Sequence, residues 1–197
     1  GWVFSRSIVF LKTWYAKRMA SPVLRNFIGG AVVVIAALLL QTQRYLGLSL
    51  PLLTDAFNGT AHFYDFLGKL GFTVLSLGAG YQGGEVTPLF EIGATLGAAL
   101  APILHVSIPF LAALGFIGVF SGATNTPIAC FVMGIELFGG QAASYFFMIC
   151  LVSFMCSGNS GIYSAQKVVV KKGILFLPMM GSQKQSERSK GRTKTRK

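Results

Sequence analysis

The sequence predicts an all-α integral membrane protein with broken and partial-depth helices. Its 197 residues are 53% apolar and only 12% charged, whereas a soluble domain has about 25% charged residues. None of its 17 lysines and arginines lies between Leu70 and Gln166, so this long segment suits lipid better than water. After Gly78, glycine, proline and small polar residues repeatedly interrupt the apolar sequence, a pattern typical of discontinuous membrane helices.

The N-terminal part of the chain predicts four helical segments. Residues 3–20 place apolar and basic side chains at helical spacing, which predicts an amphipathic helix that enters or lies along the membrane interface. Residues 26–43 form an uncharged run that is long enough for one membrane span. Residues 48–57 are too short to cross about 30 Å of hydrocarbon and predict a partial-depth helix. Residues 62–78 form the second long apolar segment.

Two later segments share one design, in which small residues precede a proline at a predicted helix start. In residues 78–88, Thr87 is the candidate N-cap and Pro88 the first helical residue. Residues 121–127 repeat the pattern and end in Pro127. A helix start exposes free N–H groups and about half a positive charge, so an anion is its natural ligand. Each segment taken alone is equally compatible with an ordinary loop between spans.

These segments resemble motifs of the chloride-channel (CLC) superfamily of anion channels and proton-coupled anion exchangers. Residues 84–97 are similar to the family's Gly-x-Phe-x-Pro helix, and residues 121–139 to a later helix with its corner motif. Residues 161–165 are similar to the last helix, in which a tyrosine hydroxyl faces the central anion site. The resemblance implies that residues 1–176 form only the second half of a CLC-type inverted-repeat fold, so the chain is interpreted as a possible fragment that lacks the first repeat.

The sequence Gly84-Glu85-Val86-Thr87 narrows the resemblance to one branch of the superfamily. Chloride-type members mostly have apolar residues here, whereas this sequence looks like the bacterial fluoride exporters that are coupled to protons. The resemblance implies that Gly84, Glu85, Val86, Thr87 and Tyr163 line the anion pathway, with Glu85 coupling anion movement to protons. Fluoride is hard to dehydrate, so its site needs strong donors such as a protonated carboxyl, hydroxyls and backbone N–H groups. The competing interpretation of Glu85 is a solvated carboxylate favoured by the helix dipole.

The predicted function is therefore CLC-type anion transport, with proton-coupled fluoride export as the specific prediction. The alternatives are a chloride channel or a chloride/proton exchanger and, in another class, a non-transporting membrane subunit or remnant. The predicted partners are a small anion (fluoride or chloride), protons, the lipid bilayer and, by family resemblance, a second copy in a homodimer. Because donors from both repeats are needed for a closed path, this chain alone is not expected to transport.

Several features argue against other classes of protein. The Gly-x-Gly-x-x-Gly match at residues 78–83 lacks the acidic residue of a dinucleotide site. There is no nucleophile with a base and no metal-ligand spacing, so we predict no enzyme activity, cofactor or metal. Residues 177–197 are strongly basic and predict a disordered cytoplasmic tail at a bacterial inner membrane rather than a nucleic-acid-binding segment. The cysteines lie in apolar surroundings and predict buried thiols; they are Cys130, Cys150 and Cys156.

Four further features have structural interpretations. Glu91 lies on a different helical face from Glu85 and is predicted to be an interface or vestibule residue. Glu136 lies in the corner motif and is predicted to make a structural hydrogen bond. His105 is predicted to be an interface residue. The small-residue spacing of residues 93–97 permits a close helix contact with an unidentified partner helix.

Overall fold

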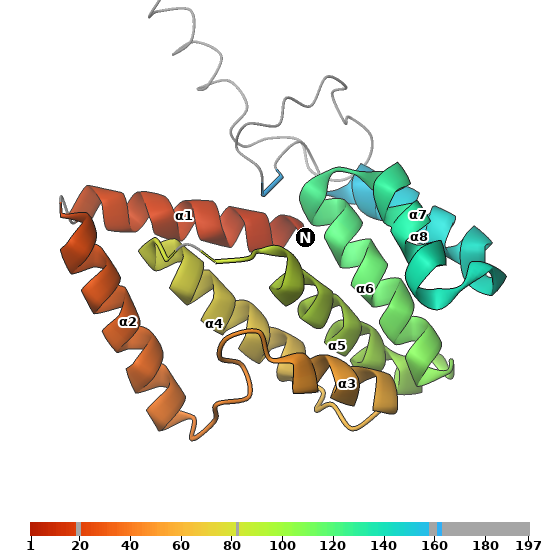
Figure 1. Cartoon of the computed structure of the whole chain (residues 1–197), viewed down its shortest axis with the longest axis horizontal. Coiled ribbons are helices and arrows are strands. Elements are labelled where there is room, and N and C mark those ends of the chain that lie inside the picture. Colours follow the sequence, from red (N-terminus) through yellow and green to blue (C-terminus); the bar gives the residue numbers. More distant parts are fainter. Residues whose placement is uncertain (19–20, 82, 158–160, 163–197) are drawn as a thin grey trace, which may run out of the picture.

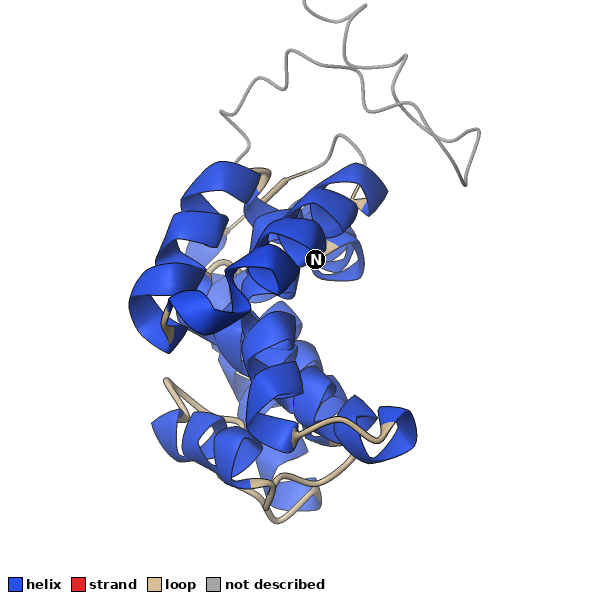
Figure 2. Cartoon of the chain, turned by 90° about the vertical axis from the view of Figure 1, so that its right-hand side faces the viewer, coloured by secondary structure: helices blue, strands red, loops and turns tan. Residues whose placement is uncertain are grey.

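The computed structural model describes residues 1–18, 21–81, 83–157 and 161–162. Within these ranges the regular elements are all helices (Figure 1), and Figure 2 shows them joined by loops. The helices are α1 (Trp2–Arg18), α2 (Pro22–Leu39), α3 (Leu50–Asn58), α4 (Asp65–Ala79), α5 (Val86–Leu104), α6 (Ile108–Thr124), α7 (Pro127–Phe138), the short 3₁₀ helix η1 (Gly140–Ala142) and α8 (Ala143–Cys156).

The helices agree with the segments that the sequence predicts, and their lengths are uneven. Helices α2 and α5 are long and apolar enough to cross a membrane, whereas α6, α7 and α8 are apolar but shorter. With nine residues, α3 is about 13 Å long at 1.5 Å per residue, which confirms a partial-depth element. Proline lies in the first turn of α2, α3, α6 and α7, where its missing N–H breaks no hydrogen bond.

The centre of the molecule is the packing of α5 against α6, which lie side by side in Figure 1. A Cβ atom on Gly93 would overlap the carbonyl oxygen of Gly115, and one on Gly97 would overlap that of Leu111. Helix α6 is therefore the partner that the spacing of residues 93–97 left unidentified. Small and aromatic side chains of α5, α6, α7 and α8 complete this core; they include Ala94, Ala98, Ala112, Phe116, Cys130 and Phe146.

A single methyl group at the α5–α6 contact is expected to destabilise the protein. Gly97→Ala places Cβ against backbone that cannot move aside, and overpacking of this kind costs about 1–3 kcal/mol. Gly71→Ala in α4 is the matched control, because its Cβ would meet open space and a helical alanine is favoured over glycine by about 0.5–1 kcal/mol. Thermal unfolding in detergent compares the two variants. A loss of stability at Gly71 and none at Gly97 would contradict the close helix contact.

The N-terminal helices surround one side of this core. Helix α1 packs against α4 and the end of α6, where Phe4 and Ile8 join an apolar cluster with Leu77, Leu89 and Ala123. Helix α2 contacts α4 but leaves most of its apolar surface uncovered, as in Figure 1, where it lies at the edge of the molecule. Its exposed apolar side chains include Val23, Phe27, Leu38 and Leu39. An apolar face of this kind is typical of a helix that contacts lipid.

Candidate functional site

The glycine-rich segment before α5 forms a sharp re-entry into the helix. Helix α4 ends at Ala79, Gly80 follows with φ +104°, and α5 begins at Val86 with Glu85 at the N-cap position. The prediction of Thr87 as N-cap and Pro88 as first helical residue is therefore wrong by two positions. Because the N–H groups of the whole first turn lack helical partners, proline is tolerated as the third helical residue as well as the first.

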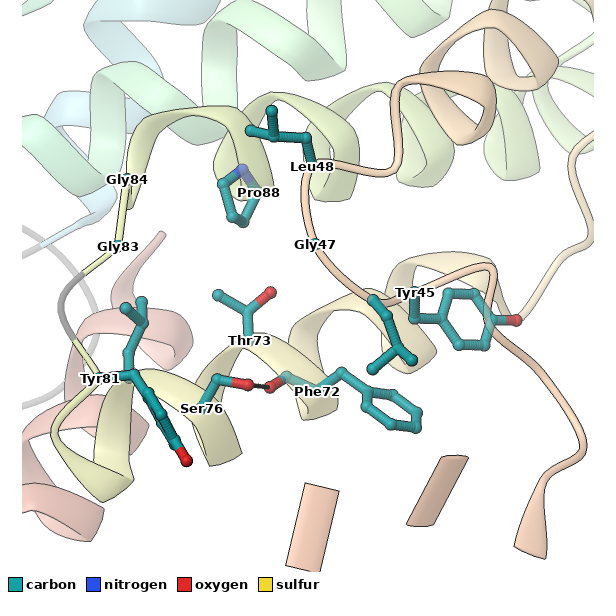
Figure 3. Close-up of a pocket in the computed structure, with 12 residues that line it drawn as sticks. Tyr45, Gly47, Leu48, Phe72, Thr73, Ser76, Tyr81, Gly83, Gly84 and Pro88 are labelled. Atoms are coloured by element: carbon teal, nitrogen blue, oxygen red, sulfur yellow. Dashed lines mark hydrogen bonds between the residues drawn. The ribbon is translucent and has the colours of Figure 1, made fainter. Parts of the chain in front are cut away.

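A cavity of about 330 Å³ adjoins this helix start. Its walls are the segment of residues 45–48, one face of α4, and the start of α5 with Tyr81. In Figure 3, Thr73 on α4 points across the cavity toward Pro88, whereas the hydroxyl of Ser76 donates to the carbonyl oxygen of Phe72 at 2.9 Å. Of the predicted pathway residues, Gly84 lines this cavity. The cavity therefore presents hydroxyl groups on one side and glycine backbone on the other.

A second cavity, of about 610 Å³, lies between α1, the start of α2 and the segment before α5. It contains Glu85, whose Oε1 lies 3.7 Å from Nζ of Lys12. The guanidinium of Arg25 also lines it and lies against Gly80, where the absence of a side chain leaves room for it. Tyr81 lines both cavities, and its hydroxyl donates a hydrogen bond of 2.9 Å to the carbonyl oxygen of Asn26. One carboxylate and two cations thus surround the second cavity.

The predicted pathway residues do not all face one space. Gly84 lines the first cavity and Glu85 the second, whereas Val86 and Thr87 are half-buried and line neither of them. Tyr163 lies outside the described residues. Its neighbour Ile162 donates its N–H to the carbonyl oxygen of Ala123 at 3.0 Å and packs against the cluster that contains Leu89 of α5.

A fully buried ion pair joins α4 to α5. Nζ of Lys69 lies 2.8 Å from Oε2 of Glu91, and the two side chains are 1% and 0% exposed. The prediction that Glu91 is an interface or vestibule residue is therefore wrong, because it lies inside the protein with a countercharge. The ammonium of Lys69 also donates to the carbonyl oxygen of Gly47 at 2.8 Å and to Oγ of Ser49 at 2.9 Å. The sequence signal for this ion pair was the single lysine within the apolar segment of residues 62–78, since a buried charge needs a partner.

A second polar cluster lies beside this ion pair at the beginning of α4. The buried carboxylate of Asp65 accepts a hydrogen bond of 2.7 Å from the hydroxyl of Tyr45 and lies 3.3 Å from Arg44. Arg44 also pairs with Asp55 of α3 at 2.5 Å. Burial, together with the hydrogen bond to Asp65, raises the pKa of Tyr45 above its usual value. These contacts join the segment after α2 to both α3 and α4.

Three of the remaining interpretations can be compared with the structure. Glu136 is exposed on α7, and the predicted structural hydrogen bond of its carboxylate has no partner among the described residues. His105 ends α5 in a left-handed conformation and is exposed. Cys130 and Cys150 are buried as predicted, but Cys156 is exposed at the end of α8.

Comparison with known proteins decides the family. Residues 1–158 match the family model described as voltage gated chloride channel. The chain belongs to the voltage-gated chloride channel (CLC) family. It is 47% identical over 162 residues to a protein of Pseudomonas syringae pv. tomato named "Chloride/fluoride channel protein", an alignment that covers 78% of this chain and 36% of that relative.

A solved CLC structure has the same arrangement of helices. The crystal structure of a CLC-type fluoride/proton antiporter superposes with a TM-score of 0.81 at 38% identity, covering 84% of this chain and 42% of that one. The chain therefore spans less than half the length of these two relatives. The match confirms the predicted all-helical, partial CLC fold, and the family places the chain among integral membrane proteins.

Proposed function

We propose that the protein containing this chain exports fluoride across a membrane in exchange for protons. The observation that carries the proposal is the start of α5, where Gly84 lines one cavity and the carboxylate of Glu85 lies beside Lys12 in the next. The names of the two relatives also support it, since both contain the word fluoride. The less specific proposal, anion transport of the CLC type, depends only on the family assignment and on the start of α5.

The charges around Glu85 suggest how proton and anion could be linked. An ionised Glu85 pairs with Lys12 at 3.7 Å and would repel an anion at the helix start. Protonation removes that repulsion, leaves the charges of Lys12 and Arg25 available to the anion, and turns the carboxyl into a hydrogen-bond donor. Anion occupancy of the helix start would therefore depend on whether Glu85 carries a proton.

We assign the anion pathway to Gly84, Glu85, Val86, Thr87 and Tyr163, with Glu85 as the proton-coupling group. The working protein is proposed to be a homodimer in a bacterial inner membrane, with residues 1–176 in the membrane region and 177–197 as a cytoplasmic tail. Its partners are a small anion, protons and lipid. The second candidate is a chloride channel or chloride/proton exchanger, which the word chloride in the name of the Pseudomonas relative favours.

Side-by-side flux measurements test the proposal. Liposomes that contain the full-length protein are loaded with fluoride or chloride, and ion-selective electrodes record efflux while a pH electrode records proton uptake. Fluoride efflux is expected to exceed chloride efflux by about tenfold or more, a discrimination of ~1.4 kcal/mol, and to be accompanied by proton uptake. Equal rates, or faster chloride efflux, would favour the second candidate. Fluoride efflux without proton movement would indicate a channel.

A further inference from the structure

The ammonium group of Lys69 links the three walls of the first cavity. Lys69 is one helical turn before Thr73 of the α4 wall, and its Nζ bonds to the carbonyl oxygen of Gly47 in the second wall. Its ion-pair partner Glu91 is three residues after Pro88, which belongs to the third wall. In Figure 3, these three walls surround the space between Gly47, Thr73 and Pro88.

We propose that Lys69 is a positioning residue for anion transport, with Glu91 as its countercharge. Its ammonium holds the segment of residues 45–49 and the start of α5 at fixed positions against α4, which keeps the cavity beside Gly84 in shape. This inference rests on the proposed anion-transport function, and it assigns a role to a residue pair that touches neither the anion nor Glu85.

The contacts of Lys69 explain why the positioning role needs its ammonium group, and why an apolar side chain of similar volume would not be enough. An apolar pair could fill the volume between α4 and α5, because both side chains are fully buried. Such a pair would leave the carbonyl oxygen of Gly47 and the hydroxyl of Ser49 without the donor that they now share. The segment around Gly47 and Ser49 would then lose two of the bonds that hold it against α4 beside the cavity. Hydrogen-bond donors to an ion have to be held within about 0.5 Å of their working geometry.

The experiment separates positioning from stability by measuring both in the full-length protein. The double variant Lys69→Met/Glu91→Leu removes both charges, so its unfolding temperature is expected to stay close to that of the wild type. Its half-saturating fluoride concentration in liposome efflux is expected to rise about tenfold, a change of ~1.4 kcal/mol in apparent affinity. The single variant Ser49→Ala removes one acceptor without leaving a buried charge, and it should raise that concentration by a smaller factor. Lys17→Met, an exposed lysine of α1, is the control that should change neither quantity.

The outcomes distinguish this inference from the proposed function. If the wild type carries chloride instead of fluoride, the substrate proposal fails, and the same three variants are compared by chloride efflux. A double variant that folds and keeps the wild-type half-saturating concentration overturns the positioning role and leaves the ion pair purely structural. If the double variant does not fold, Ser49→Ala decides: an unchanged half-saturating concentration overturns the inference, and a raised one supports it.

Discussion

Lys69→Met is expected to lower the stability of the protein by about 3–5 kcal/mol, because it leaves the carboxylate of Glu91 buried without a countercharge. The two side chains are 1% and 0% exposed, so water cannot replace the lost ammonium. In addition, Gly47 and Ser49 lose the donor that joins them to α4. Thermal unfolding of the purified variant in detergent, followed by tryptophan fluorescence, measures the effect.

Two comparisons identify the cause of that loss. The second substitution in Lys69→Met/Glu91→Leu removes the stranded carboxylate, and replacing a buried ion pair by apolar side chains of similar volume is often neutral or stabilising. Lys17→Met removes an exposed lysine and should cost less than about 1 kcal/mol. If Lys69→Met and Lys17→Met unfold at the same temperature, the buried ion pair is absent from the native protein.

Much of the helical framework could be predicted from local chemistry. Proline in the first turn and glycine after the last turn place several helix ends within a few residues, as α3 and α7 show. The small residues at Gly93 and Gly97 predict a close contact, but only the fold shows that Gly115 and Leu111 of α6 make it. The start of α5 was misplaced because Thr87 and Pro88 form a good cap and first residue, and local preference does not exclude an earlier start.

The candidate site was less predictable, since it depends on which helices meet. Lys69 and Glu91 lie on different helices, and the local sequence around either residue does not indicate that the other is its partner. Along α5, Glu85 and Glu91 are six residues apart, which turns their side chains by about 240°. One carboxylate consequently faces α1 and the second cavity, and the other faces α4 inside the protein. The difference in faces was predicted, but the buried partner of Glu91 was not.

Glu85→Gln is expected to abolish proton uptake while fluoride flux continues. Glutamine has the same size as glutamate and retains a hydrogen-bond donor, but it cannot exchange a proton. It also removes the charge that pairs with Lys12 at 3.7 Å, so the anion no longer competes with a carboxylate at the helix start. Simultaneous fluoride-electrode and pH-electrode recordings from liposomes that contain the full-length variant measure the two fluxes. Protein yield should change little, because the side chain of Glu85 makes no cap hydrogen bond to α5.

Two companion variants separate coupling from anion affinity and from general loss of charge. Thr87→Val keeps the shape of the side chain and deletes one hydroxyl donor, so it should weaken fluoride affinity without changing the number of protons moved per anion. Glu136→Gln removes an exposed carboxylate of α7 and should leave both fluxes as in the wild type. If Glu85→Gln keeps the wild-type proton-to-fluoride ratio, Glu85 is a solvated residue at a helix start. The proton then has to cross through another group, and the coupling role assigned to Glu85 would be withdrawn.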